Sequence, residues 1–221
     1  MSEQPEKWEI YLSKADFDRQ RSDPRLPVIL NLARIVNVLN FCFRTLLQSK
    51  DDGTPAEQRQ YFNSFLFACG ILYEGLKVAN TLGKRFGDRD SFRNGFGRLL
   101  KDKETKRLLE TVLNPMRNKI VFHFEEDVMK TTVQELDLES YSFVVGSGQA
   151  SGDAYYELAD TTAINFIIGN PDSKEEASQS FRETVKSITQ VLSGYTDSAN
   201  VLIVDVLREL NWKRRESPKD S

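Results

Sequence analysis

The sequence contains only one histidine and two cysteines among 221 residues. Cys42 and Cys69 lie in apolar helical runs, where a free cysteine behaves as a small buried hydrophobe, so no disulfide framework is predicted. These three residues are too few for a closed zinc site; carboxylates could hold magnesium, but we predict no metal and no cofactor. Acid–base chemistry near neutral pH would most naturally use His123, because imidazole exchanges protons between about pH 5 and 8.

Long apolar runs and triphosphate-binding motifs are also missing. No stretch reaches the roughly 18 to 20 uninterrupted apolar residues of a membrane helix, and the first seven residues lack the basic and apolar regions of a signal peptide. We therefore expect a cytoplasmic protein without a membrane partner. The absence of a GxxxxGK[ST] run counts against a nucleotide-dependent transferase. At 39% hydrophobic residues, the chain is long enough for one large domain with its own core.

The positive charge is concentrated in one segment of the chain. Between Lys84 and Lys119 there are 11 Lys and Arg residues against 5 Asp and Glu residues, although the whole chain has a net charge of −3. A polyanion such as RNA is the natural ligand of a basic patch, and the alternative is a basic face that is merely solvated. The candidate RNA-binding residues in this segment are Arg89, Arg93, Arg98, Lys101, Lys103, Lys106 and Arg107.

Apolar periodicity predicts a mainly α-helical chain. The first expected helix is apolar over so much of its circumference that it is either central in a bundle or shared with a second subunit. Asn114-Pro115 is expected to kink a later helix or to begin a new one. The helices are expected over residues 24–48, 55–82, 91–100, from 103 onward, and 173–212.

The pattern changes between about residues 125 and 160. Runs of β-branched and aromatic residues, 141–145 and 155–158, flank a glycine-rich stretch. This arrangement predicts a β-hairpin with a flexible tip, inserted before the long C-terminal helix. We expect a single domain over 24–212, preceded by a polar N-terminal arm (1–23) and followed by a mobile tail (213–221).

Arg117, Asn118 and His123 form the one cluster of residues suited to chemistry. On an ideal helix, Arg117 and His123 lie about 120° apart around the axis and about 9 Å apart along it, so one helix alone does not assemble a site. Two copies that meet across a two-fold axis could place two imidazoles and two guanidinium groups in a common groove. The alternative for a lone histidine on an apolar stripe is a core residue with one hydrogen bond.

Arg117-Asn118 followed by His123, on a late helix of an α-helical bundle, resembles the HEPN superfamily (higher eukaryotes and prokaryotes nucleotide-binding). The run 116–124, with its acidic continuation 125–127, is similar to bacterial abortive-infection and toxin members of that group. The resemblance implies an up-and-down bundle of four to five helices and a homodimer with the motif at the interface. It further implies metal-independent RNA cleavage in active members, a toxin or phage-defence role, and an antitoxin or regulatory protein as a partner.

Cleavage of RNA through its own 2′-hydroxyl needs a base, an acid and positive charge on the phosphate. Two copies of His123 could divide the acid and base roles, and Arg117 would bind the phosphate oxygens. By the resemblance, Asn118 would orient the phosphate or the imidazole. Glu74, a carboxylate within the apolar run 71–76, could support the site from the second helix, and the alternative is an acid that the helix merely exposes. Lys119 is a further supporting candidate. The alternative function is a non-catalytic helical dimer that acts as an RNA- or protein-binding module.

Overall fold

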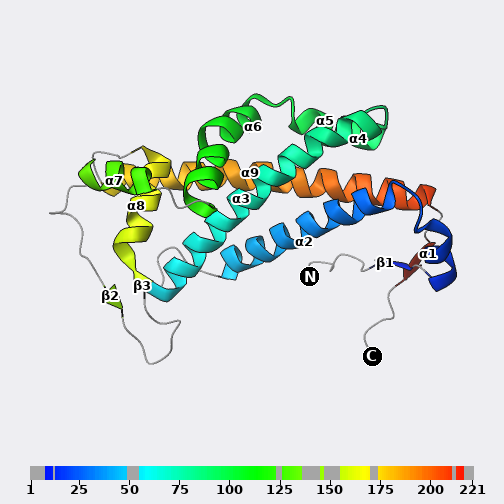
Figure 1. Cartoon of the computed structure of the whole chain (residues 1–221), viewed down its shortest axis with the longest axis horizontal. Helices are drawn as coiled ribbons and strands as arrows, with labels where there is room; N and C mark the ends of the chain where they lie inside the picture. Colours follow the sequence, from blue (N-terminus) through cyan, green and yellow to red (C-terminus); the bar gives the residue numbers. More distant parts are fainter. Residues whose placement is uncertain are drawn as a thin grey trace, which may run out of the picture.

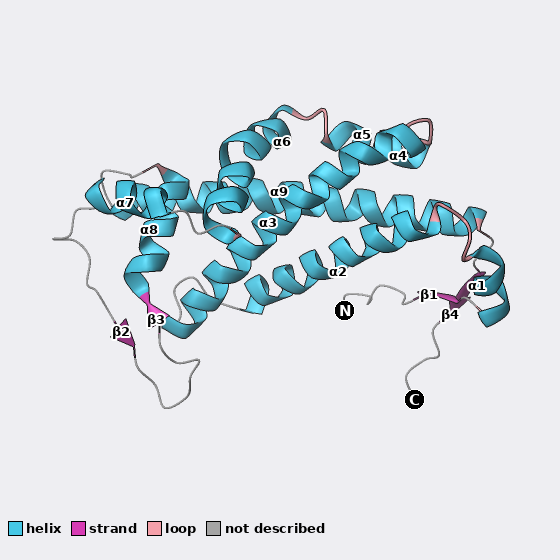
Figure 2. Cartoon of the chain, viewed as in Figure 1, coloured by secondary structure: helices cyan, strands magenta, loops and turns pink. Residues whose placement is uncertain are grey.

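The computed structural model describes residues 8–11, 13–48, 55–122, 126–135, 145–146, 155–169, 174–210 and 213–216. The fold is mainly α-helical, as the periodicity predicts (Figure 2). Three long helices run beside one another along the molecule: α2 (Leu26–Gln48), α3 (Pro55–Phe86) and α9 (Lys174–Glu209) (Figure 1). They agree with three of the expected helices to within a few residues at each described end.

Shorter elements join and flank these three helices. Between α3 and α9 the chain forms α4 (Asp90–Asn94), α5 (Phe96–Leu99), α6 (Lys103–Leu108), the π-helical segments η1 (Leu109–Leu113) and η2 (Met116–Val121), α7 (Glu126–Glu135), the strands β2 (Val145–Gly146) and β3 (Tyr155–Tyr156), and α8 (Glu157–Ile168). The ends of the chain contribute β1 (Trp8–Tyr11), α1 (Lys14–Gln20) and β4 (Lys213–Glu216).

The core lies where the apolar stripes of α2, α3 and α9 meet. Each stripe repeats every three or four residues, so one face of each helix is removed from water. Leu39 of α2, Leu72 of α3 and Leu202 of α9 are completely buried. Phe62 and Phe65 of α3 pack on Phe181 of α9, with ring centroids 6.3 and 5.5 Å apart.

Two glycines lie inside long helices instead of ending or bending them. The sequence predicts that Gly83 and Gly87 end α3 and that Gly194 bends or divides α9. Helix α3 runs through Gly83 and ends at Phe86, directly before Gly87, and α9 continues through Gly194. Past Gly83 the last turn of α3 is held by Phe86, which is 2% exposed, so burial outweighs the poor helix propensity of glycine. At Gly194 a Cβ would lie 3.2 Å from a methyl group of Leu99, so the missing side chain lets α5 approach α9.

The helix that contains Asn114-Pro115 neither breaks nor restarts there. Both residues have helical backbone angles, and π-helical segments lie on either side of them. The Asn114 N–H donates to the Leu109 carbonyl, five residues back. Proline has no N–H to donate, and the wider π winding lets the helix pass it without a new N-terminus.

Both ends of the region predicted as a β-hairpin, about 125–160, are helical. Residues 126–135 form α7 and residues 157–168 form α8, and these two helices pack on each other. Glu126 and Asp127 favour a helix because acidic side chains in the first turn complement the helix dipole, although the segment is rich in β-branched residues. Val145 and Gly146 pair antiparallel with Tyr156 and Tyr155. The remainder of the expected hairpin lies outside the described residues.

Two short segments, 8–11 and 213–216, pair with each other, which differs from the expectation of a polar arm and a mobile tail. Strand β1 pairs antiparallel with β4, so that Trp8 lies opposite Glu216 and Tyr11 opposite Lys213. The side-chain amide of Gln20 also donates to the carbonyl of Leu210. Pairing between residues some 200 positions apart leaves no trace in local composition, which is why the sequence did not predict it.

By length and composition alone, α2 and α3 each contain a stretch apolar enough to cross a membrane. Such stretches also occur in the core helices of soluble proteins, so this is weak evidence. In α3, 56% of the stretch is buried inside the structure, as expected of a core helix; in α2 only 33% is buried. The exposed apolar side chains of α2 include Leu30, Phe41 and Leu47. The first helix is therefore not fully enclosed by the single chain.

Candidate functional site

The candidate site is centred on Arg117, in η2, where a series of polar contacts holds its side chain. The Arg117 Nε lies 2.8 Å from Glu74 Oε1 on α3, and its Nη1 donates to Asn118 Oδ1 at 2.8 Å. The Asn118 Nδ2 in turn donates to Asn114 Oδ1 at 2.5 Å. Two residues of the predicted motif and Glu74 are therefore brought together. These contacts restrict the guanidinium to one orientation.

The contact between Arg117 and Glu74 is an ion pair of intermediate burial. Their side chains are 29% and 39% exposed, but Nε and Oε1 themselves are shielded from solvent. These two atoms are close, yet their alignment does not meet hydrogen-bond geometry, so the attraction is mainly electrostatic. Glu74 also faces Lys77, whose Nζ is 3.9 Å from Oε2. One carboxylate thus lies between two cations.

Phe122 lies beside the Arg117 guanidinium and against α3. The Arg117 guanidinium carbon is 5.4 Å from the centre of the Phe122 ring, a cation–π distance. The ring and Val121 lie against Gly70, where a Cβ would come within 2.9 Å of Phe122 and 3.1 Å of Val121. Gly70 therefore allows η2 to lie directly on α3 beside the motif.

His123 lies outside the described residues, so the structure describes Arg117 and Asn118 but not the third residue of the motif. Lys119 is described: its Nζ is 5.8 Å from the centre of the Phe166 ring on α8. Sequence reasoning missed Asn114, Phe122 and Gly70. Asn114 precedes Asn118 by four residues, a spacing that places two side chains on the same helix face and could have revealed the pair.

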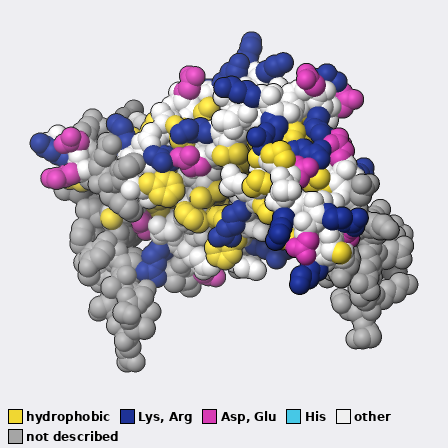
Figure 3. Space-filling view, turned by 45° about the vertical axis from the view of Figure 1, so that its right-hand side comes forward, with side chains coloured by type: hydrophobic (Ala, Val, Ile, Leu, Met, Phe, Trp, Pro, Cys, Tyr) yellow, Lys and Arg dark blue, Asp and Glu magenta, His cyan; other side chains and the backbone are white. Residues whose placement is uncertain are grey.

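Several of the candidate RNA-binding residues are already paired within the protein. Arg89 binds Asp205 and Glu209 on α9, Arg93 binds Asp90, and Arg107 binds Glu104. Arg98 donates to the side-chain oxygen of Asn94. Among the described residues, no ion-pair partner is present for Lys101, Lys103 or Lys106, which are exposed. On the face that Figure 3 shows, Lys and Arg side chains are spread among other residues instead of gathering in one patch.

Arg89 belongs to a cluster that fastens the start of α4 to the end of α9. Its Nη1 lies 3.1 Å from Asp205 Oδ2 and its Nη2 donates to Glu209 Oε2 at 2.6 Å, while Arg25 reaches Glu209 at 2.8 Å. Arg89 holds the pKa of Glu209 below its ordinary value. Because the folded-state pKa is lowered, this stabilisation is present above about pH 4.5 and is lost as the pH falls further.

Arg89→Ala is therefore expected to lower stability and to leave RNA affinity unchanged. Ion pairs at this degree of exposure contribute about 1 kcal/mol or less each, so a small fall in the thermal midpoint is expected at neutral pH. That difference from wild type should shrink as the pH falls below about 4.5 and Glu209 becomes protonated, which needs a lower pH in wild type because Arg89 lowers the pKa of Glu209. Thermal unfolding across pH and RNA titrations measure the two effects. A loss of RNA affinity with unchanged stability would contradict this assignment.

A surface pocket of about 540 Å³ lies between the basic segment and α9. It is lined by Arg98, but also by Asp102 and Asp197, so its charges are mixed. Its lining also includes Gly95, Gly194 and Ser198. Within the part of the chain that the structure describes, no group of three or more His, Cys, Asp or Glu side chains is arranged to hold a metal ion.

Comparisons of the chain with protein-family models, with curated proteins and with solved structures find no match. The interpretation of the site therefore depends on its own residues: a motif of Arg117, Asn118 and His123, and an acid on a neighbouring helix that contacts the arginine. A guanidinium held in one plane is suited to binding two oxygens of a phosphate or carboxylate.

Proposed function

We propose that the chain is a metal-independent endoribonuclease of HEPN type, with a toxin or phage-defence role in the cytoplasm. In this proposal the bundle is HEPN-like, and the composite site of a homodimer uses Arg117, Asn118 and His123 from both protomers. Arg117 would bind the non-bridging oxygens of the scissile phosphate, and the two imidazoles would serve as acid and base. An antitoxin or regulatory protein would be a further partner.

One observation carries the proposal: Glu74 and Asn118 contact the Arg117 side chain, and Asn114 holds Asn118, a few residues before the only histidine of the chain. Such preorganisation is what a phosphate-stabilising group needs, because a donor that is already oriented pays no reorganisation cost during the reaction. The exposed apolar side chains of α2 offer a surface through which two protomers could associate.

The experiment is induced expression of wild type beside Arg117→Ala and His123→Ala, with growth and total RNA integrity followed over time. Growth arrest and RNA loss confined to wild type would support the proposal. Light scattering on the purified proteins reports whether each variant still forms the same oligomer. Equal RNA loss for all three proteins, or harmless expression of wild type together with no cleavage in vitro, would count against a nuclease.

Gly70→Ala gives a prediction that depends on the position of Phe122. The added Cβ would lie 2.9 Å from the Phe122 ring, which is 42% exposed and can swing outward, so the fold should survive. Because Phe122 directly precedes His123, we expect cleavage to fall by about ten- to a hundredfold, as small misplacements of catalytic groups do. Single-turnover cleavage measures the effect.

The matched control for that variant is Gly83→Ala on the same helix, where the added Cβ meets Phe92 only at ordinary contact distances of 3.5 and 3.7 Å. It should cleave as wild type does. If Gly70→Ala also cleaves at the wild-type rate, Phe122 does not position the site.

The second candidate is a non-catalytic helical dimer that binds RNA or a protein. The ion pair between Arg117 and Glu74 favours it, because a guanidinium neutralised by a carboxylate has less charge to offer a phosphate. This alternative predicts that His123→Ala changes neither RNA integrity nor partner binding.

A further inference from the structure

A second groove, of about 660 Å³, lies between the start of α2 and the end of α3. Its polar lining consists of Asn31 from α2 and Thr81, Lys84 and Arg85 from α3, and its apolar lining includes Val28 and Val78. None of the residues that line it is acidic. The groove is outside the set of residues that the sequence singled out as RNA-binding.

The charged side chains that line this groove are of one sign. Helix α2 contains Arg34 and Arg44 but no Asp or Glu over its whole length. Lys84 and Arg85 are exposed, and among the described residues neither has a carboxylate within ion-pair distance. In contrast, Arg89, Arg93 and Arg107 each form an ion pair with a carboxylate. Unpaired cations above a polar lining are suited to phosphate groups.

Arg85 is also held in place before any ligand arrives. Its Nη1 donates to the backbone carbonyl of Pro24 at 2.9 Å. Because a guanidinium has five N–H donors in a fixed plane, one bond to a carbonyl orients the group and does not neutralise it. An oriented, fully charged guanidinium at the rim of a groove loses little conformational entropy when it binds a phosphate.

The groove and the Arg117 site share one outward face of α3. Arg85 follows Glu74 by eleven residues, which on a regular helix is three turns plus about 20°, and about 16 Å along the axis. Thr81 and Lys77 lie between them on this side of the helix, and Lys77 is 58% exposed at its side chain. A strand lying along this face would therefore meet Lys84 and Arg85, then Lys77, then Arg117.

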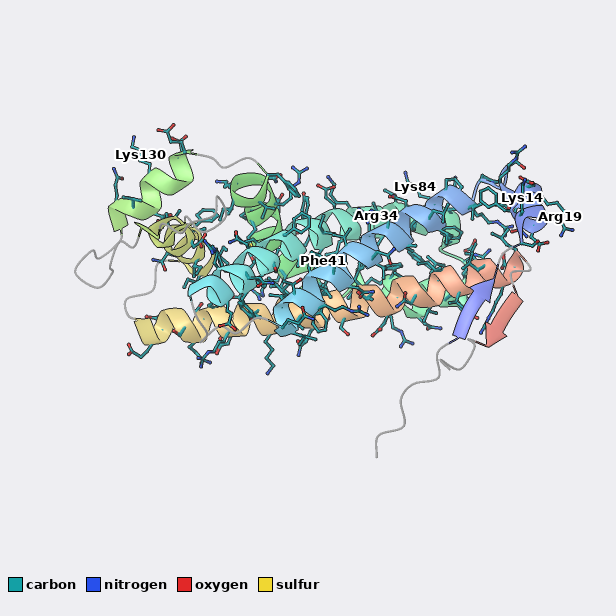
Figure 4. The ribbon with its side chains drawn as sticks, turned by 90° about the horizontal axis from the view of Figure 1, so that it is seen from below. Lys14, Arg19, Arg34, Phe41, Lys84 and Lys130 are labelled. Atoms are coloured by element: carbon teal, nitrogen blue, oxygen red, sulfur yellow. The ribbon has the colours of Figure 1, made fainter. Side chains whose placement is uncertain are left out.

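Helix α2 adds an exposed aromatic ring beside this face. Phe41 is 67% exposed, and it follows Arg34 by seven residues, almost two turns, so both point to the same side of α2. Figure 4 shows Arg34 and Phe41 on α2, with Lys84 near the end of the adjacent α3. Exposed aromatic rings alternating with cations are typical of proteins that bind single strands, because bases stack on the rings and phosphates meet the cations.

We propose that the groove between α2 and α3 binds the sugar–phosphate backbone of single-stranded RNA and leads the strand along α3 toward Arg117. The direction toward Arg117 rests on the proposed nuclease function, whereas binding in the groove does not. Lys84 and Arg85 bind phosphates, Asn31 and Thr81 offer neutral hydrogen-bonding groups, and Phe41 offers a surface on which a base can stack.

The test measures binding of a fluorescein-labelled single-stranded RNA to the full-length chain by anisotropy, in an Arg117→Ala background that prevents cleavage. Lys84→Gln combined with Arg85→Gln is expected to raise Kd by about tenfold or more. The slope of log affinity against log salt should become shallower by about 1.4, since each phosphate contact with a single strand contributes about 0.7. Arg182→Gln combined with Lys186→Gln removes the same charge from exposed positions on α9 that do not line the groove, and should change Kd by less than about twofold.

A second variant adds a negative charge instead of removing positive ones. Asn31→Asp, in the groove, should weaken binding at least as much as the double substitution, while Asn200→Asp, at an exposed position on α9 that does not line the groove, should not. Circular dichroism and thermal unfolding verify that each variant is folded. Wild-type affinity of the groove variants, or equal weakening by groove and control variants, would overturn the proposal.

Two further results separate this proposal from its alternatives. If the groove variants alter the protomer association measured by light scattering but not RNA affinity, the face joins two copies of the chain and the RNA proposal is wrong. RNA binding that depends on the groove, with no cleavage by wild type, would contradict the nuclease function and support RNA binding in the groove. Cleavage by wild type, with an unchanged KM in the groove variants, would support the nuclease function and contradict RNA binding in the groove.

Discussion

Arg117→Ala and His123→Ala are each expected to slow RNA cleavage by about a hundredfold or more. A positioned proton transfer contributes typically about 10²- to 10⁴-fold, and removing one donor to a developing negative charge costs about 10²- to 10³-fold. The measurement is single-turnover cleavage of a labelled RNA in excess EDTA, with enzyme well above its dimer dissociation constant. Because the two residues act on the same step, the double variant should be little slower than either single one.

The chemistry of Arg117 suggests a sharper version of this test. Arg117→Lys keeps the positive charge but loses the planar pair of donors, so it should recover RNA binding without recovering most of the rate. Glu74→Gln removes the carboxylate that lies 2.8 Å from the Arg117 Nε and frees the guanidinium to rotate. If Glu74 orients Arg117, this variant slows cleavage. If Glu74 merely neutralises Arg117, the same variant binds RNA more tightly and cleaves faster.

Controls decide whether a loss of rate reflects chemistry. Lys186→Ala changes an exposed charge on α9, away from the motif, and should cleave at the wild-type rate. Each variant also needs an unchanged thermal midpoint and an unchanged oligomeric state. Full activity of Arg117→Ala or His123→Ala under these conditions would be incompatible with a composite Arg/Asn/His site.

The helices that carry this site could be predicted because their signals are local. The apolar stripes of α2, α3 and α9 each repeat over many turns, and Pro55 begins α3 as expected of a proline at the first helical position. Glu74 could be predicted as a supporting residue because it is a carboxylate in an otherwise apolar run, and in the structure it contacts Arg117. Whether it supports catalysis is still a prediction.

Contacts between distant segments could not be predicted in the same way. Arg89 looked like an RNA-binding residue in a basic segment, but its partner Glu209 is 120 positions further along the chain. The pairing of β1 with β4 spans almost the entire sequence. The groove between α2 and α3 requires knowing which faces of the two helices meet, and periodicity fixes only which residues share a face.

Gly75→Ala is expected to destabilise the protein, although alanine is ordinarily the better helix former. A Cβ at this position would lie 2.9 Å from both the Oη and the Cζ of Tyr195 on α9, and Tyr195 is completely buried. Overpacking of this kind costs about 1–3 kcal/mol, more than the gain of up to about 1 kcal/mol from replacing glycine. Each kcal/mol lowers the midpoint of a domain of this size by about 2–4 °C in thermal unfolding, which measures the effect.

Gly83→Ala supplies the matched control, because it makes the same substitution on the same helix where the new Cβ meets Phe92 at no less than 3.5 Å. It should raise stability by about 0.4–1 kcal/mol, so the two variants should move the midpoint in opposite directions. Tyr195→Phe removes the Oη, a buried hydroxyl with no hydrogen-bond partner among the described residues. Burial raises the pKa of that phenol, as expected of a group without a compensating contact. Tyr195→Phe should therefore cost little alone and should partly rescue Gly75→Ala; equal destabilisation in both backgrounds would show that the clash does not involve the hydroxyl.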